Sequence, residues 1–140
     1  MIALDSSVIV AALVSWHERH AQAARAVERA LGAKDGVVIP LHALVESLAV
    51  LTRLPAPHRL APADALTLLR ENFASTPLAG LHARSAWQVL NRVVANGLGG
   101  GITHDAVILE SAEDAGATEL LTLNERDYER LDPRLSFRTP

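Results

Sequence analysis

The stretch Ile2-Ala3-Leu4-Asp5-Ser6-Ser7-Val8 opens the chain with a short apolar run that ends in an acid and two hydroxyl residues. The apolar run predicts a buried strand, and either serine can cap a helix predicted over Val8–Val14. Two similar apolar runs follow at Val37–Ile39 and Leu120–Thr122. Short apolar strands of this kind are typical of a parallel sheet that is covered on both faces.

Helical patterns fill the segments between these strands, and glycine or proline marks many of their ends. The order of strands and helices predicts an α/β fold with one domain over residues 1–140, a small parallel β-sheet sandwiched between α-helices. The predicted helices are His17–Leu31, Leu41–Leu54, Pro62–Phe73, Ala83–Asn96, Thr103–Ala115 and Glu125–Leu131, and further short strands are predicted at Pro77–Leu81 and, at the sheet edge, Leu135–Arg138.

Composition narrows the class of protein. Of the 140 residues, 49% are hydrophobic and 21% charged, which excludes disorder over most of the chain. The chain has no cysteine, which excludes disulfides and thiolate metal sites. The net charge of −3 argues against binding nucleic acid through bulk positive charge, but not against a nuclease with an acidic site. No apolar run approaches the ~20 residues of a membrane span and no signal peptide is present, so we expect a cytoplasmic protein with no membrane partner.

Four acids fall beyond the predicted carboxyl ends of the strands, where open α/β sheets bind their ligands. Asp5 ends the first strand, Glu46 lies in the helix after the second, Asp105 opens the helix that follows three glycines, and Asp127 follows the third strand. Each acid alone has a structural alternative, which is a salt bridge for Glu46 and a helix cap, helix-terminal charge or solvated turn for the others. The strongly apolar helix around Glu46 predicts that this carboxylate is buried and needs a partner.

Together, the four acids predict a metal site. Carboxylates that meet at one sheet edge repel each other unless a cation lies between them. Oxygen ligands favour Mg²⁺ or Mn²⁺ over zinc, and such ions suit hydrolysis of a phosphodiester. The sequence has no P-loop, no dinucleotide fingerprint and no G-x-S-x-G motif. The spacing of the six histidines favours surface or capping roles over a ligand set.

The same residues resemble those of a known family. The opening Leu4-Asp5-Ser6-Ser7-Val8, the pair Val45-Glu46, the segment Thr103-His104-Asp105-Ala106 and the closing Leu121-Thr122-Leu123-Asn124-Glu125-Arg126-Asp127-Tyr128 resemble motifs of PIN-domain ribonucleases. The likeness is to their VapC-like branch, the toxins of bacterial toxin–antitoxin systems, and it runs from residue 2 to about residue 131.

This resemblance implies a metal-dependent endoribonuclease that acts as the toxin of a VapBC-type system. Asp5, Glu46 and Asp105 would bind Mg²⁺ or Mn²⁺, and either Asp127 or Asn124 would complete the site, because some relatives carry the last acid at the position of Asn124. The implied partners are an RNA substrate, a VapB-like antitoxin and a second copy of the chain in a homodimer. The residues implied to support the acids are Ser7, Thr122 and Asn124.

Two alternatives share the α/β prediction. Asn124 in place of an acid would suit a PIN-fold binding module that is catalytically inactive. A receiver-like signalling domain also gathers acids at strand ends, but it requires a lysine after a late strand. The only lysine, Lys34, precedes the second strand. The four acids therefore favour the nuclease.

Overall fold

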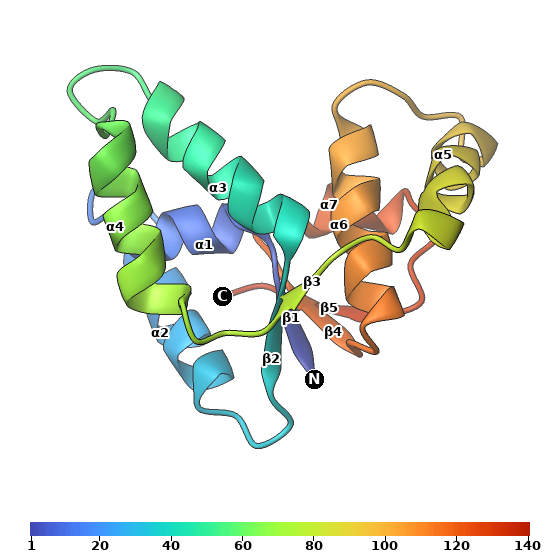
Figure 1. Ribbon diagram of the computed structural model, residues 1–140, viewed down its shortest axis with the longest axis horizontal. Helices are drawn as coiled ribbons and strands as arrows, with labels where there is room; N and C mark the ends of the chain where they lie inside the picture. The colour runs from blue at the N-terminus through green and yellow to red at the C-terminus, as the bar shows by residue number, and fades with distance from the viewer.

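Five parallel strands form the centre of the computed structural model, which describes residues 1–140 (Figure 1). Their order across the sheet is β3-β2-β1-β4-β5, so the first strand of the chain is the central one. This architecture confirms the predicted α/β fold. The strands are β1 (Ile2–Leu4), β2 (Val37–Pro40), β3 (Leu78–Ala79), β4 (Glu119–Leu121) and β5 (Ser136–Arg138).

Seven α-helices surround the sheet. In Figure 1, α1, α2 and α4 lie on one side of the strands and α5 and α6 on the other, while α3 rises from the end of β2. This arrangement is the predicted sandwich of helices around a sheet. The helices are α1 (Ser6–Leu13), α2 (His20–Leu31), α3 (Leu41–Arg53), α4 (Pro62–Phe73), α5 (Ala86–Ala95), α6 (Ile102–Asp114) and α7 (Glu125–Glu129).

The register places the ends of the central strands beside one another. Ala3 of β1 lies opposite Val38 of β2 on one side and Leu120 of β4 on the other. Because all five strands are parallel, their carboxyl ends meet at one edge of the sheet. Helices α1, α3 and α7 begin within a few residues of these ends, which brings distant parts of the sequence to the same edge.

Several predicted boundaries are wrong by a few residues, for local reasons. Helix α1 begins at Ser6 rather than Val8, because the Asp5 carboxylate accepts the Ser6 N–H at 2.8 Å and takes the N-cap position. Helix α2 begins at His20, after a turn in which the Arg19 N–H donates to the ring of His17. A short 3₁₀ helix, Ala83–Ser85, replaces the predicted start of α5.

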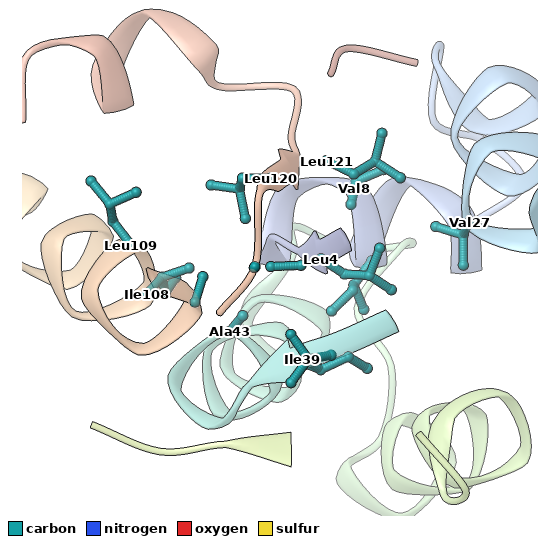
Figure 2. Packing of buried hydrophobic residues seen from close by; sticks show 14 of the residues in the cluster. Leu4, Val8, Val27, Ile39, Ala43, Ile108, Leu109, Leu120 and Leu121 are labelled. Atoms are coloured by element: carbon teal, nitrogen blue, oxygen red, sulfur yellow. The ribbon is translucent and has the colours of Figure 1, made fainter. Parts of the chain in front are cut away.

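Buried apolar side chains from both helical layers pack against the central strands (Figure 2). Ile108 and Leu109 of α6 lie to one side of β1 and β4, and Val8 and Val27 lie on the other side. Leu4 of β1 is fully buried between these layers. None of the seven helices has the length and apolar character that a membrane span requires.

Helix α3 is less buried than the sequence predicted. Only Ala43, Ser47 and Leu51 of this helix are buried, whereas Leu41 and Val45 remain 47% and 57% exposed. Part of the apolar surface of α3 instead forms an open apolar hollow of about 370 Å³ with α4. The prediction that this helix is largely buried is therefore wrong. The residues of α3 and α4 that line the hollow include Leu44, Val45, Leu48, Leu66, Leu69 and Phe73.

Candidate functional site

Asp5 lies at the end of the central strand with its carboxylate held by hydrogen bonds on both oxygens. Oδ1 accepts the Ser6 N–H at 2.8 Å and the Tyr128 hydroxyl at 2.7 Å. Oδ2 accepts the hydroxyls of Ser7 at 2.5 Å and Thr122 at 2.7 Å. The side chain is almost fully buried, at 2% exposure. Such a buried carboxylate is tolerated because its lone pairs are satisfied. The helix cap expected as a structural alternative is also present, so Asp5 caps α1 and faces the site.

Ser7 and Thr122 also connect Asp5 to the turn after β4. The Ser7 hydroxyl accepts the Leu123 N–H at 3.0 Å, and the Thr122 hydroxyl accepts the Asn124 N–H at 2.9 Å. Since each hydroxyl accepts from the backbone, its own proton is left for the Asp5 carboxylate. The structure thus brings together three of the residues from the opening and closing motifs.

Glu46 extends from α3 toward Asp5, and the Ser6 hydroxyl lies between the two acids. Ser6 Oγ donates to Glu46 Oε2 at 2.9 Å and lies 3.4 Å from Asp5 Oδ1. Glu46 makes no ion pair, so the salt bridge considered as its structural alternative is absent. Asp5, Ser6 and Glu46 line an open depression of about 480 Å³. Ser6 was not predicted as a site residue.

Asp105, in the first turn of α6, lies near three other carboxylates. Burial, together with the charges of Asp5, Glu46 and Asp127, raises the pKa of Asp105 to about 7. Its side chain borders both the depression that contains Asp5 and Glu46 and a neighbouring one of about 460 Å³. No basic side chain of the protein pairs with Asp105, which leaves its charge uncompensated.

Asp127 and Asn124 lie on different sides of Asp105. Asp127 lines the neighbouring depression and forms a 3.7 Å ion pair with Arg130, and both side chains are about half exposed. Asn124 lines the depression that holds Asp5 and Glu46, directly before α7. The structure therefore places Asn124, rather than Asp127, in the same hollow as the first three acids. Which of the two completes the site stays a prediction.

Two features of the site were missed from the sequence. Tyr128 is fully buried, and its hydroxyl donates to Asp5 from 123 positions away. Burial and the nearby Asp5 charge raise the pKa of Tyr128 well above its ordinary value, so the hydroxyl remains protonated and available as a donor. His42 Nε2 lies 2.9 Å from His104 Nδ1, with the rings stacked 5.0 Å apart. Burial, followed by the charge of His104, lowers the pKa of His42. The histidines are thus not all isolated in space.

The donor set of the site matches a hard divalent cation. Asp5, Glu46, Asp105 and Asn124 present only oxygen ligands and one amide to a single depression, and such ligands suit Mg²⁺ or Mn²⁺. No three Asp, Glu or His side chains are drawn close enough together to hold an ion as they stand. Carboxylates this near to one another repel, and a bound cation would offset that repulsion.

Burial, together with the charges of the neighbouring acids, predicts that ionised Asp105 destabilises the metal-free protein at neutral pH. The folded-state pKa lies above the ordinary value of 3.8, so the group favours folding below that value and this advantage is lost as pH rises toward about 7. We expect Asp105→Asn to be more stable than the parent at pH 8 by on the order of 1–2 kcal/mol, after allowance for screening by solvent. Chemical denaturation in the presence of chelator, from pH 4 to pH 8, measures this difference.

The matched control for this prediction is Asp35→Asn, an exposed aspartate in the turn before β2. Its stability relative to the parent should not change with pH in this range. An Asp105→Asn variant that gains no stability between pH 4 and pH 8 would contradict the repulsion between the acids.

Comparison with known proteins identifies the family. The family model for the PIN domain matches residues 2–132, and the chain belongs to this family. It is 42% identical to Ribonuclease VapC40 of Mycobacterium tuberculosis over 134 residues, covering 94% of both chains.

Solved structures share the fold at low sequence identity. Mycobacterium tuberculosis VapC20, a sarcin-ricin loop cleaving toxin, superposes with a TM-score of 0.74 at 16% identity, over 92% of this chain and 94% of that one. The DNA-bound VapBC of Salmonella typhimurium gives a TM-score of 0.72 at 19% identity, over 99% and 96% of the two chains. These likenesses confirm the PIN fold predicted from the sequence motifs.

Proposed function

We propose that this chain is a divalent-metal-dependent endoribonuclease that acts as the toxin of a VapBC-type toxin–antitoxin system. The observation that carries the proposal is the set of three carboxylates around one depression, Asp5, Glu46 and Asp105, none of which forms an ion pair with a basic side chain. Metal-assisted hydrolysis uses such a site, and the 42% identity to Ribonuclease VapC40 gives RNA as the substrate.

Asp5, Glu46 and Asp105 are the proposed ligands, and Mg²⁺ or Mn²⁺ is the proposed ion. When bound, the ion supplies Lewis-acid activation of water and of the phosphate group. Ser7 and Thr122 orient the Asp5 carboxylate through their hydroxyl protons. Asn124 offers an amide to the same depression, whereas Asp127 is paired with Arg130.

Two arginines can contact the RNA backbone at this site. Arg19 lines the depression that contains Asp5 and Glu46, and Arg130 lines the neighbouring one. Guanidinium groups bind phosphate oxygens in bidentate geometry, so residues at these two positions can hold the strand on either side of Asp105. This local positive charge offsets the unfavourable net charge of −3 for binding a polyanion.

The proposed protein partner is a VapB-like antitoxin, as in the VapBC assemblies that share this fold. The apolar hollow between α3 and α4 offers a surface for an apolar peptide segment. Helix α1 offers little apolar surface to such a segment, because Val8, Ile9, Val10 and Ala11 are all buried. A homodimer stays a prediction from the family resemblance.

Cleavage of a mixed RNA pool tests the proposed activity. We expect the purified protein to cleave RNA with Mn²⁺ or Mg²⁺ and to lose this activity with chelator, because Asp5, Glu46 and Asp105 form no ion pair with a basic side chain. Glu46→Gln should lose at least about tenfold in rate, since it removes a ligand charge from the proposed site. Initial rates of product formation, with and without chelator, measure both the dependence on metal and the effect of Glu46→Gln.

The matched control is Glu71→Gln, an exposed glutamate of α4 away from the site, which should cleave at the parental rate. Cleavage that persists in chelator would contradict the metal-dependent mechanism. A parent that cleaves no RNA and binds no Mn²⁺ in calorimetry would favour the alternative of an inactive PIN-fold binding module.

A further inference from the structure

Tyr128 reaches the site from behind, through the protein interior. Its ring is fully buried and packs at 5.9 Å, between ring centroids, from Phe137 of β5. Its hydroxyl donates to Asp5 Oδ1 at 2.7 Å, and no other hydrogen bond is made by this group. A buried tyrosine hydroxyl is costly unless it is paired, so the Asp5 carboxylate and the Tyr128 hydroxyl satisfy each other.

We infer that Tyr128 is a positioning residue, which sets the orientation of the Asp5 carboxylate for a divalent cation. The inference rests on the proposed metal site and deepens it. Four strong donors hold Asp5, two on each oxygen, within 2.5–2.8 Å. Of these donors, the Ser6 N–H is part of the N-cap of α1. The Ser7 and Thr122 hydroxyls also accept hydrogen bonds from the turn after β4. Tyr128 is the donor that links Asp5 to α7.

One side of the Asp5 carboxylate carries only a weak contact. This contact of Oδ1 is the Ser6 hydroxyl at 3.4 Å, longer than a strong hydrogen bond. The same hydroxyl donates to Glu46 at 2.9 Å and lines the depression, so it bridges the two acids. The Ser6 N–H and the Tyr128 hydroxyl fix the orientation of Oδ1, and a cation between the two acids would take the place of the weak Ser6 contact. Residues that orient a ligating carboxylate in this way contribute to metal affinity without touching the metal.

Tyr128→Phe removes only the hydroxyl and keeps the ring in place. We expect its affinity for Mn²⁺, measured by calorimetry, to fall about tenfold, the scale at which such supporting hydrogen bonds act. The matched control is Phe137→Leu, which disturbs the packing around the same ring but leaves the hydroxyl on Asp5. This control should lose stability and keep the parental affinity for Mn²⁺.

A second measurement keeps the Tyr128 hydroxyl in place. Tyr128 is the only tyrosine of the chain, so incorporation of 3-fluorotyrosine gives a single ¹⁹F signal. Titration with Mg²⁺ should shift this signal along the same binding curve that calorimetry gives, because the cation redistributes charge on the carboxylate that accepts the hydroxyl. In the Asp5→Asn variant the shift should disappear.

The outcomes separate this inference from the proposed function. If the parent binds Mn²⁺, Tyr128→Phe binds it equally well and the ¹⁹F signal ignores Mg²⁺, the positioning role is wrong and the metal site stands. A parent that binds neither ion overturns the metal site and the inference together. Loss of affinity in both Tyr128→Phe and Phe137→Leu would reduce Tyr128 to a packing role.

Discussion

Asp5→Asn should abolish metal-dependent RNA cleavage, with a loss of at least about 10²–10³-fold in rate, while the protein remains folded. Loss of a charged ligand affects the reaction on this scale, because it removes electrostatic stabilisation from a preorganised site. The fold should persist because asparagine also caps helices, and because the hydroxyls of Ser7 and Thr122 can accept as well as donate. Initial rates with Mn²⁺ and far-ultraviolet circular dichroism measure the two effects.

Asp35→Asn provides the matched control, since it makes the same chemical change at an exposed turn. Prepared identically, it should retain the parental rate, which also separates the chain's own activity from a contaminating nuclease. An Asp5→Asn protein that cleaves at the parental rate, with circular dichroism unchanged, would remove Asp5 from the site. In the cell, the same variant should relieve growth inhibition.

Local sequence signals were sufficient to locate Asp5 and Asp105. An apolar run that ends in an acid fixes both the strand and the position of the carboxylate at its end, whatever the rest of the chain does. Asp105 follows from three glycines that precede an apolar helix. In the structure Asp5 and Asp105 both line one depression.

Glu46 was placed at the site by its position in the helix after the second strand, but the burial predicted for that helix is wrong. Apolar residues around most of a helix suggested burial, but Leu41 and Val45 are exposed, and only one stripe of α3 meets the core. A sequence pattern records which faces are apolar, not which of them another element covers. The position of Glu46 near Asp5 depends on α3 starting at the carboxyl end of β2, which is the order that the sequence predicted.

Contacts between distant residues could not be predicted from one sequence. Tyr128 and Asp5 lie 123 positions apart, and His42 and His104 lie 62 apart. Neither pair has a local pattern, because the parallel sheet alone brings their elements together. Tyr128 is the one buried residue of α7, and the only local signal was its polar hydroxyl, which needs a partner when the ring is buried.

A buried ion network on α6 could not be predicted from the sequence, for the same reason. Glu110 and Glu113 of α6 are almost fully buried, at 1% and 4% side-chain exposure. Arg92 of α5 donates to both at 2.8 Å and also to the carbonyls of Leu131 and Asp132, at 2.7 and 2.8 Å. Burial acts to raise the pKa of Glu113, but hydrogen bonds from Arg92 and an adjacent arginine outweigh it, and the pKa lies below its ordinary value.

Arg92 therefore joins three parts of the fold. It connects α5 to α6, which begins near Asp105, and to the turn that follows α7, where Asp132 adopts a left-handed backbone with φ of 51°. Each of its three guanidinium nitrogens donates at least one hydrogen bond. Lysine cannot reproduce this fork, because it has a single point charge on a flexible stem.

Arg92→Met should consequently destabilise the fold by about 3–5 kcal/mol, the scale of removing one partner from a buried ion pair, because only the exposed Arg134 then remains beside the two acids. The side chain is only 11% exposed, so water cannot replace the guanidinium at Glu110. Urea denaturation at pH 7 measures the change. Arg134→Ala is the matched control, because Arg134 contacts the same two acids from a position that is 57% exposed, and it should lose about 1 kcal/mol or less.

A double variant separates lost packing from an unpaired charge. If the unpaired carboxylate causes the loss, then adding Glu110→Gln to Arg92→Met should restore part of the stability, since the remaining buried group is then neutral. A double variant that is less stable than Arg92→Met alone would exclude the buried charge as the cause of the loss. An Arg92→Met variant that loses no more stability than Arg134→Ala would show that the buried ion network does not stabilise the fold. In either result, metal affinity at Asp5 and Glu46 should follow the folded fraction only, because Arg92 makes no contact with these acids.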